Sequence, residues 1–129
     1  MTDQLISYTT AVLAKAKGFD AETLWSVSDS YKLPLRAIGG WGDGENHNAD
    51  EFKYSCPTQS LLAHWLREKH WLHVNAQHNM HYCWQVQVQD VKGYDGTERV
   101  FDTKWLMHDY NTYEDALEAG LAHALNQIK

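Results

Sequence analysis

The chain has 129 residues, of which 43% are hydrophobic and 22% are charged, and its formal net charge is −6. This length is typical of one folded domain, so we predict a single domain over residues 1–129. The acidic balance disfavours a protein that binds nucleic acid through a broad basic face. Two cysteines are too few for a disulfide scaffold, no leader stands at Met1, and no apolar run approaches the roughly 20 residues of a membrane helix, so we expect a cytoplasmic protein.

The first predicted element is a helix over residues 8–17. Ser7 suits the N-cap, because its side chain can accept a hydrogen bond from the first turn. Gly18 suits the left-handed residue that ends a helix, and Phe19 stands where a closing hydrophobic contact is expected. Residues 24–28 then alternate roughly and predict a short strand that has ended by Pro34.

Residues 39–52 predict a long loop, because glycines and turn formers replace any helical or strand period. Its carboxylates raise the possibility of a calcium site, although their spacing does not follow the EF-hand pattern; they are Asp43, Glu45, Asp50 and Glu51. Trp41 falls in this loop, outside the predicted core.

A second helix is predicted from residue 58 to about residue 70. Apolar residues recur on one side of it, and polar residues occupy the other. The apolar stripe consists of Leu61, Leu62, Trp65 and Leu66, and the opposite side of Ser60, His64 and Arg67.

The pair Asp95-Gly96 is typical of a two-residue hairpin turn, which sets a register for the two strands that it joins. That register pairs Trp84 with Met107, Val86 with Trp105, and Val88 with Thr103, and all six would share one face. A further strand should place Leu72, Val74 and Ala76 on the same face, if a turn at residues 77–79 preserves the alternation.

The last helix should begin after Thr112, where Asp115 completes a capping pattern. Its apolar stripe consists of Tyr113, Ala116, Leu117, Gly120, Leu121, Ala124, Leu125 and Ile128. The predicted fold is therefore α+β, in the order α-β-α-β-β-β-α, with an antiparallel sheet of three to four strands and helices packed on one face.

Three segments resemble a family of small uncharacterised phage and prophage proteins of Bacteroides-type bacteria. The first is the run Pro57-Thr58-Gln59-Ser60-Leu61-Leu62, continued by Trp65-Leu66-Arg67-Glu68, His70 and His73. The others are the opening helix, residues 7–19, and the closing run Tyr-Glu-Asp-Ala-Leu-Glu-Ala-Gly-Leu at residues 113–121. The resemblance implies a phage or prophage origin, and it implies no reaction or catalytic residues.

The histidines between positions 64 and 81 offer a candidate metal site. In the register above, His73 lies across from Cys83 and diagonal to His81, on the face opposite the core. Imidazole and thiolate side chains at such a spacing could hold zinc with an open position. The alternative is that these side chains are solvent-facing or hydrogen bonded, and we predict no cofactor.

Two other chemistries are weighed against simpler interpretations. Cys56 precedes Pro57 at a helix start, where a thiol can become nucleophilic if His47 or His64 acts as its base; the alternative is an inert buried residue. The αβββα order from residue 58 on matches double-stranded RNA-binding domains, but Glu114 and Asp115 stand where those domains carry basic residues. We therefore expect no nucleic-acid binding.

Trp71 on the outer sheet face and Trp41 in the loop are candidates for an exposed aromatic surface. Our leading interpretation is a non-enzymatic, phage-derived accessory or interaction protein that binds a host or phage macromolecule through the outer sheet face and the glycine-rich loop, with an unknown protein as one candidate partner. One alternative is a small-ligand-binding or zinc-dependent protein using His73, His81 and Cys83, and another is a structural or assembly component.

Overall fold

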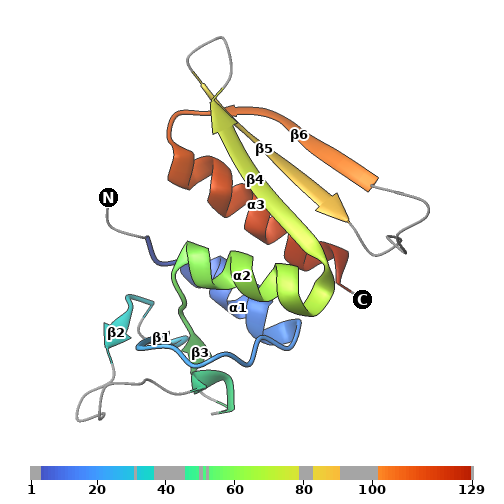
Figure 1. Cartoon of the computed structure of the whole chain (residues 1–129). Coiled ribbons are helices and arrows are strands. Elements are labelled where there is room, and N and C mark those ends of the chain that lie inside the picture. Colours follow the sequence, from blue (N-terminus) through green and yellow to red (C-terminus); the bar gives the residue numbers. More distant parts are fainter. Residues whose placement is uncertain are drawn as a thin grey trace. The chain divides into compact units, whose positions relative to one another are not determined.

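In a computed structural model, the described part of the chain comprises residues 4–30, 32–36, 46–49, 51, 53–78, 83–90 and 102–128. The chain divides into two compact units, residues 1–61 and residues 62–129 (Figure 1). Helices and antiparallel sheets are both present, so the predicted α+β class is confirmed. The prediction of one domain over residues 1–129 stays a prediction.

The first unit opens with helix α1, Tyr8–Ala16. The Ser7 side chain accepts a hydrogen bond from the Thr10 amide at 3.2 Å, which confirms Ser7 as the N-cap. Gly18 has a φ of 90°, in the left-handed region that suits glycine. The Phe19 amide donates to the Ala14 carbonyl at 3.0 Å, and the Phe19 ring is buried, so the predicted helix end is also confirmed.

A small antiparallel sheet of order β2-β1-β3 completes this unit. Strand β1, Trp25–Val27, confirms the predicted strand, whereas β2, Leu35–Arg36, and β3, Tyr54–Ser55, were not predicted. Two-residue strands are too short to show an alternating pattern in the sequence. They form because Trp25 pairs with Arg36, and Val27 with Tyr54, across the sheet.

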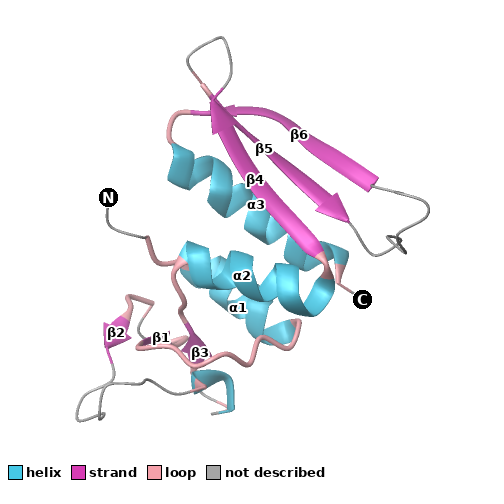
Figure 2. Cartoon of the chain, viewed as in Figure 1, coloured by secondary structure: helices cyan, strands magenta, loops and turns pink. Residues whose placement is uncertain are grey.

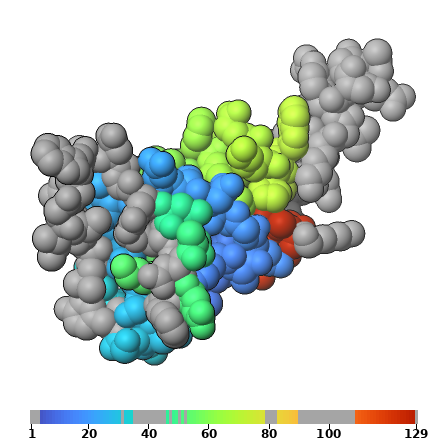
Figure 3. Space-filling model, turned by 90° about the horizontal axis from the view of Figure 1, so that it is seen from below, coloured from blue at the N-terminus to red at the C-terminus, as the bar shows by residue number. Residues whose placement is uncertain are grey.

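Part of the predicted loop at residues 39–52 is ordered as the 3-10 helix η1, His47–Ala49, which corrects the loop prediction there. Asn48 holds this segment in place. Its side chain donates to the Phe19 carbonyl at 2.8 Å and accepts from the Ser55 amide at 2.8 Å. In the space-filling view, the blue surface of α1 accordingly borders the green-teal segment around η1 (Figure 3).

Helix α2, Gln59–His70, spans the boundary between the units. Its first turn is capped by Thr58, whose hydroxyl accepts from the Leu61 amide at 3.2 Å. The predicted two sides are confirmed for the described side chains. Leu62, Trp65 and Leu66 are buried and Leu61 is half-buried, whereas Ser60, His64 and Arg67 are exposed.

The second unit contains the antiparallel sheet β4-β5-β6 and helix α3 (Figure 2). The strands are β4, Leu72–His78, β5, Trp84–Asp90, and β6, Asp102–Tyr110. Helix α3, Tyr113–Gln127, packs on this sheet through an apolar stripe of buried residues, namely Ala116, Leu117, Gly120, Leu121, Ala124 and Leu125. The predicted αβββα order from residue 58 is thus confirmed.

The predicted strand registers were wrong, although the core face of β4 and β5 was right. Val86 pairs with Leu106, and Trp105 lies opposite Gln87, one position away from the predicted pairing. In the other hairpin β4 continues to His78, which pairs with Trp84, so Gln77 and His78 belong to the strand and not to the predicted turn at residues 77–79. The residues predicted to face the core in that hairpin are nevertheless correct, because Val74 pairs with Val88 and both are buried.

Helix α3 lies very close to the sheet at one glycine. A Cβ atom added to Gly120 would lie 2.3 Å from Cγ2 of Val86 and 2.7 Å from Cγ1 of Val74. Carbon atoms in contact are normally about 3.5–4.0 Å apart. Glycine is therefore needed at position 120 for packing. At the start of the helix, the Thr112 hydroxyl accepts a hydrogen bond from the Asp115 amide at 3.1 Å, which confirms the predicted cap.

Candidate functional site

The face of β4 and β5 opposite the core carries a continuous set of polar side chains. Leu72 and Val74 on β4, and Val86 and Val88 on β5, are buried, so the alternating residues point to the other side of the sheet. These residues face one another in three register pairs, His73 with Gln89, Asn75 with Gln87, and Gln77 with Gln85. We call this set of six residues the amide face.

Five of the six residues of the amide face have a side-chain amide, and all six are exposed or half-buried. Each amide offers two N–H donors and a carbonyl acceptor, so the face can both donate and accept hydrogen bonds along its whole length. At one end Gln85 donates to the Asp109 carboxylate at 3.4 Å.

His73 is the one titratable residue of the amide face. Partial burial, together with the nearby positive charge of Arg67, lowers the pKa of His73 below its ordinary value. Its imidazole is therefore mainly neutral at pH 7. As a result the amide face carries no formal charge, although the whole chain carries a net charge of −6.

Trp71 lies between α2 and β4, two positions before His73. Its φ is 57°, and it is the one non-glycine residue with a positive φ in the described part of the chain. A left-handed residue turns the chain out of a helix, but glycine adopts this conformation at lower cost. The Trp71 side chain is nevertheless 55% exposed, so core packing does not explain a tryptophan at this position.

The structure brings together some of the predicted site residues and separates others. His73 is in β4, whereas Trp71 precedes this strand and has a left-handed backbone, so the alternation along β4 does not determine the direction of the Trp71 side chain. Cys83 is half-buried, and its expected partner His73 pairs instead with Gln89, so the pairing behind the zinc hypothesis was wrong. Among the described residues, no three His, Cys, Asp or Glu side chains are grouped to hold a metal. His81 and Trp41 lie outside the described residues, as do Asp43, Glu45 and Asp50.

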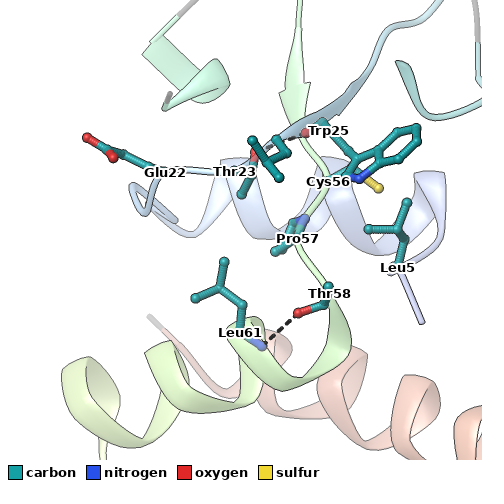
Figure 4. A pocket seen from close by; sticks show the side chains of 9 residues that line it. Leu5, Glu22, Thr23, Trp25, Cys56, Pro57, Thr58 and Leu61 are labelled. Carbon is teal, nitrogen blue, oxygen red and sulfur yellow. Dashed lines mark hydrogen bonds between the residues drawn. The ribbon is translucent and has the colours of Figure 1, made fainter. Parts of the chain in front are cut away.

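Cys56 is fully buried in the first unit, and its Sγ donates to the Ile6 carbonyl at 3.3 Å. It adjoins a pocket of about 210 Å³ that opens beside the start of α2 (Figure 4). Apolar residues dominate the lining, namely Leu5, Leu24, Trp25, Pro57 and Leu61. The hydroxyls of Thr23 and Thr58 already bond to the backbone, at the Trp25 carbonyl and the Leu61 amide. Glu22 is the one charged residue of the lining, and it is exposed to solvent, so most of the pocket wall is apolar.

A polar cluster that sequence reasoning missed joins α1, β3 and the segment after β1. The hydroxyls of Tyr8 and Tyr54 both donate to the Asp29 carboxylate, the second at 3.2 Å. These bonds lower the pKa of Asp29, and the hydrogen bond to Asp29 raises the pKa of Tyr8 to about 12. The Lys32 Nζ lies 5.1 Å from the centre of the Tyr8 ring, and the Lys15 Nζ lies 5.0 Å from the centre of the Tyr54 ring. No spacing in the sequence indicates this long-range cluster.

Aromatic rings also meet where β5 adjoins α3. Trp84 packs edge-on against His78 and Tyr113, with ring centres 5.1 and 5.5 Å apart. The first turn of α3 carries Glu114 and Asp115, which gives it a negative charge. This charge is opposite to the one needed by a helix that contacts phosphates.

Comparisons with protein-family models, with curated proteins and with solved structures gave no match. In the described part of the chain, no helix has the length and apolar character needed to cross a membrane.

Proposed function

We propose that the chain is a non-enzymatic accessory protein, encoded by a phage or prophage, that binds a macromolecule through the amide face. The observation that carries this proposal is the row of paired amides, exposed or half-buried, on the strand that follows the exposed Trp71 in the chain. A surface that offers many donors and acceptors suits recognition of a polar partner. The phage origin is supported only by the resemblance of residues 57–73 and of the two terminal helices to the phage protein family.

The strained backbone at Trp71 adds support. A left-handed conformation costs a residue with a Cβ roughly 1–2 kcal/mol, and glycine avoids most of that cost. An exposed tryptophan that gains little from burial must offset this cost in another way, and aromatic side chains are enriched where proteins bind partners. Trp71 would then extend the binding surface at the start of β4.

The chemistry of the amide face favours binding over catalysis. Amides neither donate nor accept protons at neutral pH, and they are weak nucleophiles. His73 is the one candidate acid or base on this surface, and no second titratable residue of the amide face pairs with it. We therefore propose no reaction for this site.

The test compares what the wild-type chain and charged variants retain from a host lysate. The combined substitution Asn75→Arg and Gln87→Glu replaces one amide pair with opposite charges directly across the strands, which the sheet tolerates. A matched control places the same charges at exposed positions, Asn126→Arg and Ser60→Glu. We expect a macromolecule retained by the wild type and the control to be lost from the amide-face variant. Identical retention by all three chains would refute the proposal.

A further inference from the structure

The hydrogen-bonding pattern of the amide face indicates the chemical class of its ligand. Neighbouring strands lie about 4.8 Å apart, and residues on one face repeat about every 6.8 Å along a strand. The pairs Asn75–Gln87 and His73–Gln89 therefore place four side chains that donate and accept hydrogen bonds at neighbouring positions of one sheet face. A hydroxyl group also both donates and accepts, so a hydroxyl-rich chain is chemically suited to such a face.

The charge of the amide face excludes other classes of ligand. Nucleic acids and other polyanions are held mainly by lysine and arginine, and none of the six residues is a lysine or an arginine. Calcium sites are built mainly around carboxylates, and none of the six residues has one, while zinc is most often held by thiolates and imidazoles, of which this face has only His73. An amphipathic helix requires an apolar groove, whereas this face consists of amides. A neutral polar ligand remains.

Trp71 supplies the apolar part of such a recognition site. Its side chain is 55% exposed and stands two positions before His73. The C–H groups on one side of a pyranose ring form an apolar surface that packs against an indole ring, while the hydroxyls around the ring rim reach polar side chains. The exposed Trp71, two positions before His73 in the chain, and the paired amides offer these two kinds of contact.

We infer that the amide face and Trp71 bind a neutral polysaccharide or oligosaccharide. This inference rests on the proposed function and specifies the ligand of the same surface. The affinity comes from several neutral hydrogen bonds and one stacking contact, each of which contributes modestly. Binding should therefore depend little on salt, in contrast to the binding of a polyanion.

The experiment is native gel electrophoresis of the full chain through gels that contain a soluble neutral polysaccharide, with dextran, mannan, xylan and a mixed-linkage glucan tested in turn. Heparin and single-stranded RNA serve as charged comparators. We expect at least one neutral polysaccharide to retard the chain, with no retardation by either polyanion. Absence of retardation in all four neutral gels, or stronger binding of heparin or RNA, would overturn the inference.

Variants assign the binding to the amide face. Asn75→Ala combined with Gln87→Ala should raise the dissociation constant about tenfold, because two hydrogen-bonding side chains are lost. Asn126→Ala on the exposed side of α3 should leave it unchanged. Equal retardation of the double variant and the wild type would contradict the assignment. If the double variant does not fold, the isosteric Gln87→Glu, which converts the amide donor into a carboxylate, replaces it.

The two proposals fail in different ways. If no neutral polysaccharide binds but the variant with Asn75→Arg and Gln87→Glu loses a lysate partner, the ligand class is wrong and the binding surface stands. If that variant retains the same partners as the wild type, the binding surface itself is refuted.

Discussion

The close approach of α3 to the sheet makes Gly120→Ala the most quantitative test of the fold. The new Cβ would lie 2.3 Å from Val86 and 2.7 Å from Val74, so valine side chains on two strands would both have to move. Overpacking of this kind costs up to about 3 kcal/mol, and replacing a helical glycine with alanine returns about 1 kcal/mol. We therefore expect a net loss of about 2 kcal/mol in the free energy of unfolding.

Urea denaturation of the wild type and of Gly120→Ala measures this loss as a lower transition midpoint at an unchanged slope. Adding Val86→Ala removes the nearest methyl group, so the double variant should be more stable than the sum of the two single changes predicts, by about 1 kcal/mol. Asn126→Ala, at an exposed position of α3, serves as the control and should gain a few tenths of a kcal/mol. A Gly120→Ala chain as stable as the wild type would refute this packing of α3.

Three further predictions concern individual residues. Trp71→Gly should raise the free energy of unfolding by about 1 kcal/mol relative to Trp71→Ala, because φ is positive there, and urea denaturation of both variants checks this. Tyr8 should ionise near pH 12 in an absorbance titration. Because its pKa is raised on folding, its contribution to stability is complete below pH ~10 and is lost as the pH rises toward 12, so Tyr8→Phe should flatten that loss. A thiol reagent should modify half-buried Cys83 in the native chain and reach buried Cys56 only after unfolding; simultaneous reaction of both would contradict the burial of Cys56.

The helices could be predicted from sequence because their signals are local. Ser7, Gly18 and Thr112 act within a few residues of their own positions, and each has the predicted role. Strand faces could also be predicted for β4 and β5, because alternation depends only on parity. Their pairing could not, because it depends on how the strands are connected. Gln77 and His78 are in β4 rather than in a turn, the predicted turn at Asp95-Gly96 lies outside the described residues, and both observed registers differ from the predicted ones.

In the candidate site, too, local features could be predicted from the sequence and strand pairing could not. The outer face of β4 and β5 was predictable from alternation, whereas the proximity of His73 to Cys83 depended on the register and was wrong. The true partner, Gln89, completes a row of amides, of which Gln85, Gln87 and Gln89 already alternate with valines in the sequence. The cluster of Tyr8, Asp29 and Tyr54 joins three distant segments, so only the fold brings it together.

Chemical-shift mapping of the backbone amides tests the amide face most directly. The chain is titrated with the neutral polysaccharide that retards it most strongly in the gels, or with all four in turn if none does. We predict that the amide signals of His73, Asn75 and Gln87 shift progressively while that of Asn126 on α3 does not. Shifts confined to the first unit or to α3, or no shifts with any of the four polysaccharides, would contradict the proposal that this face of β4 and β5 binds a sugar chain.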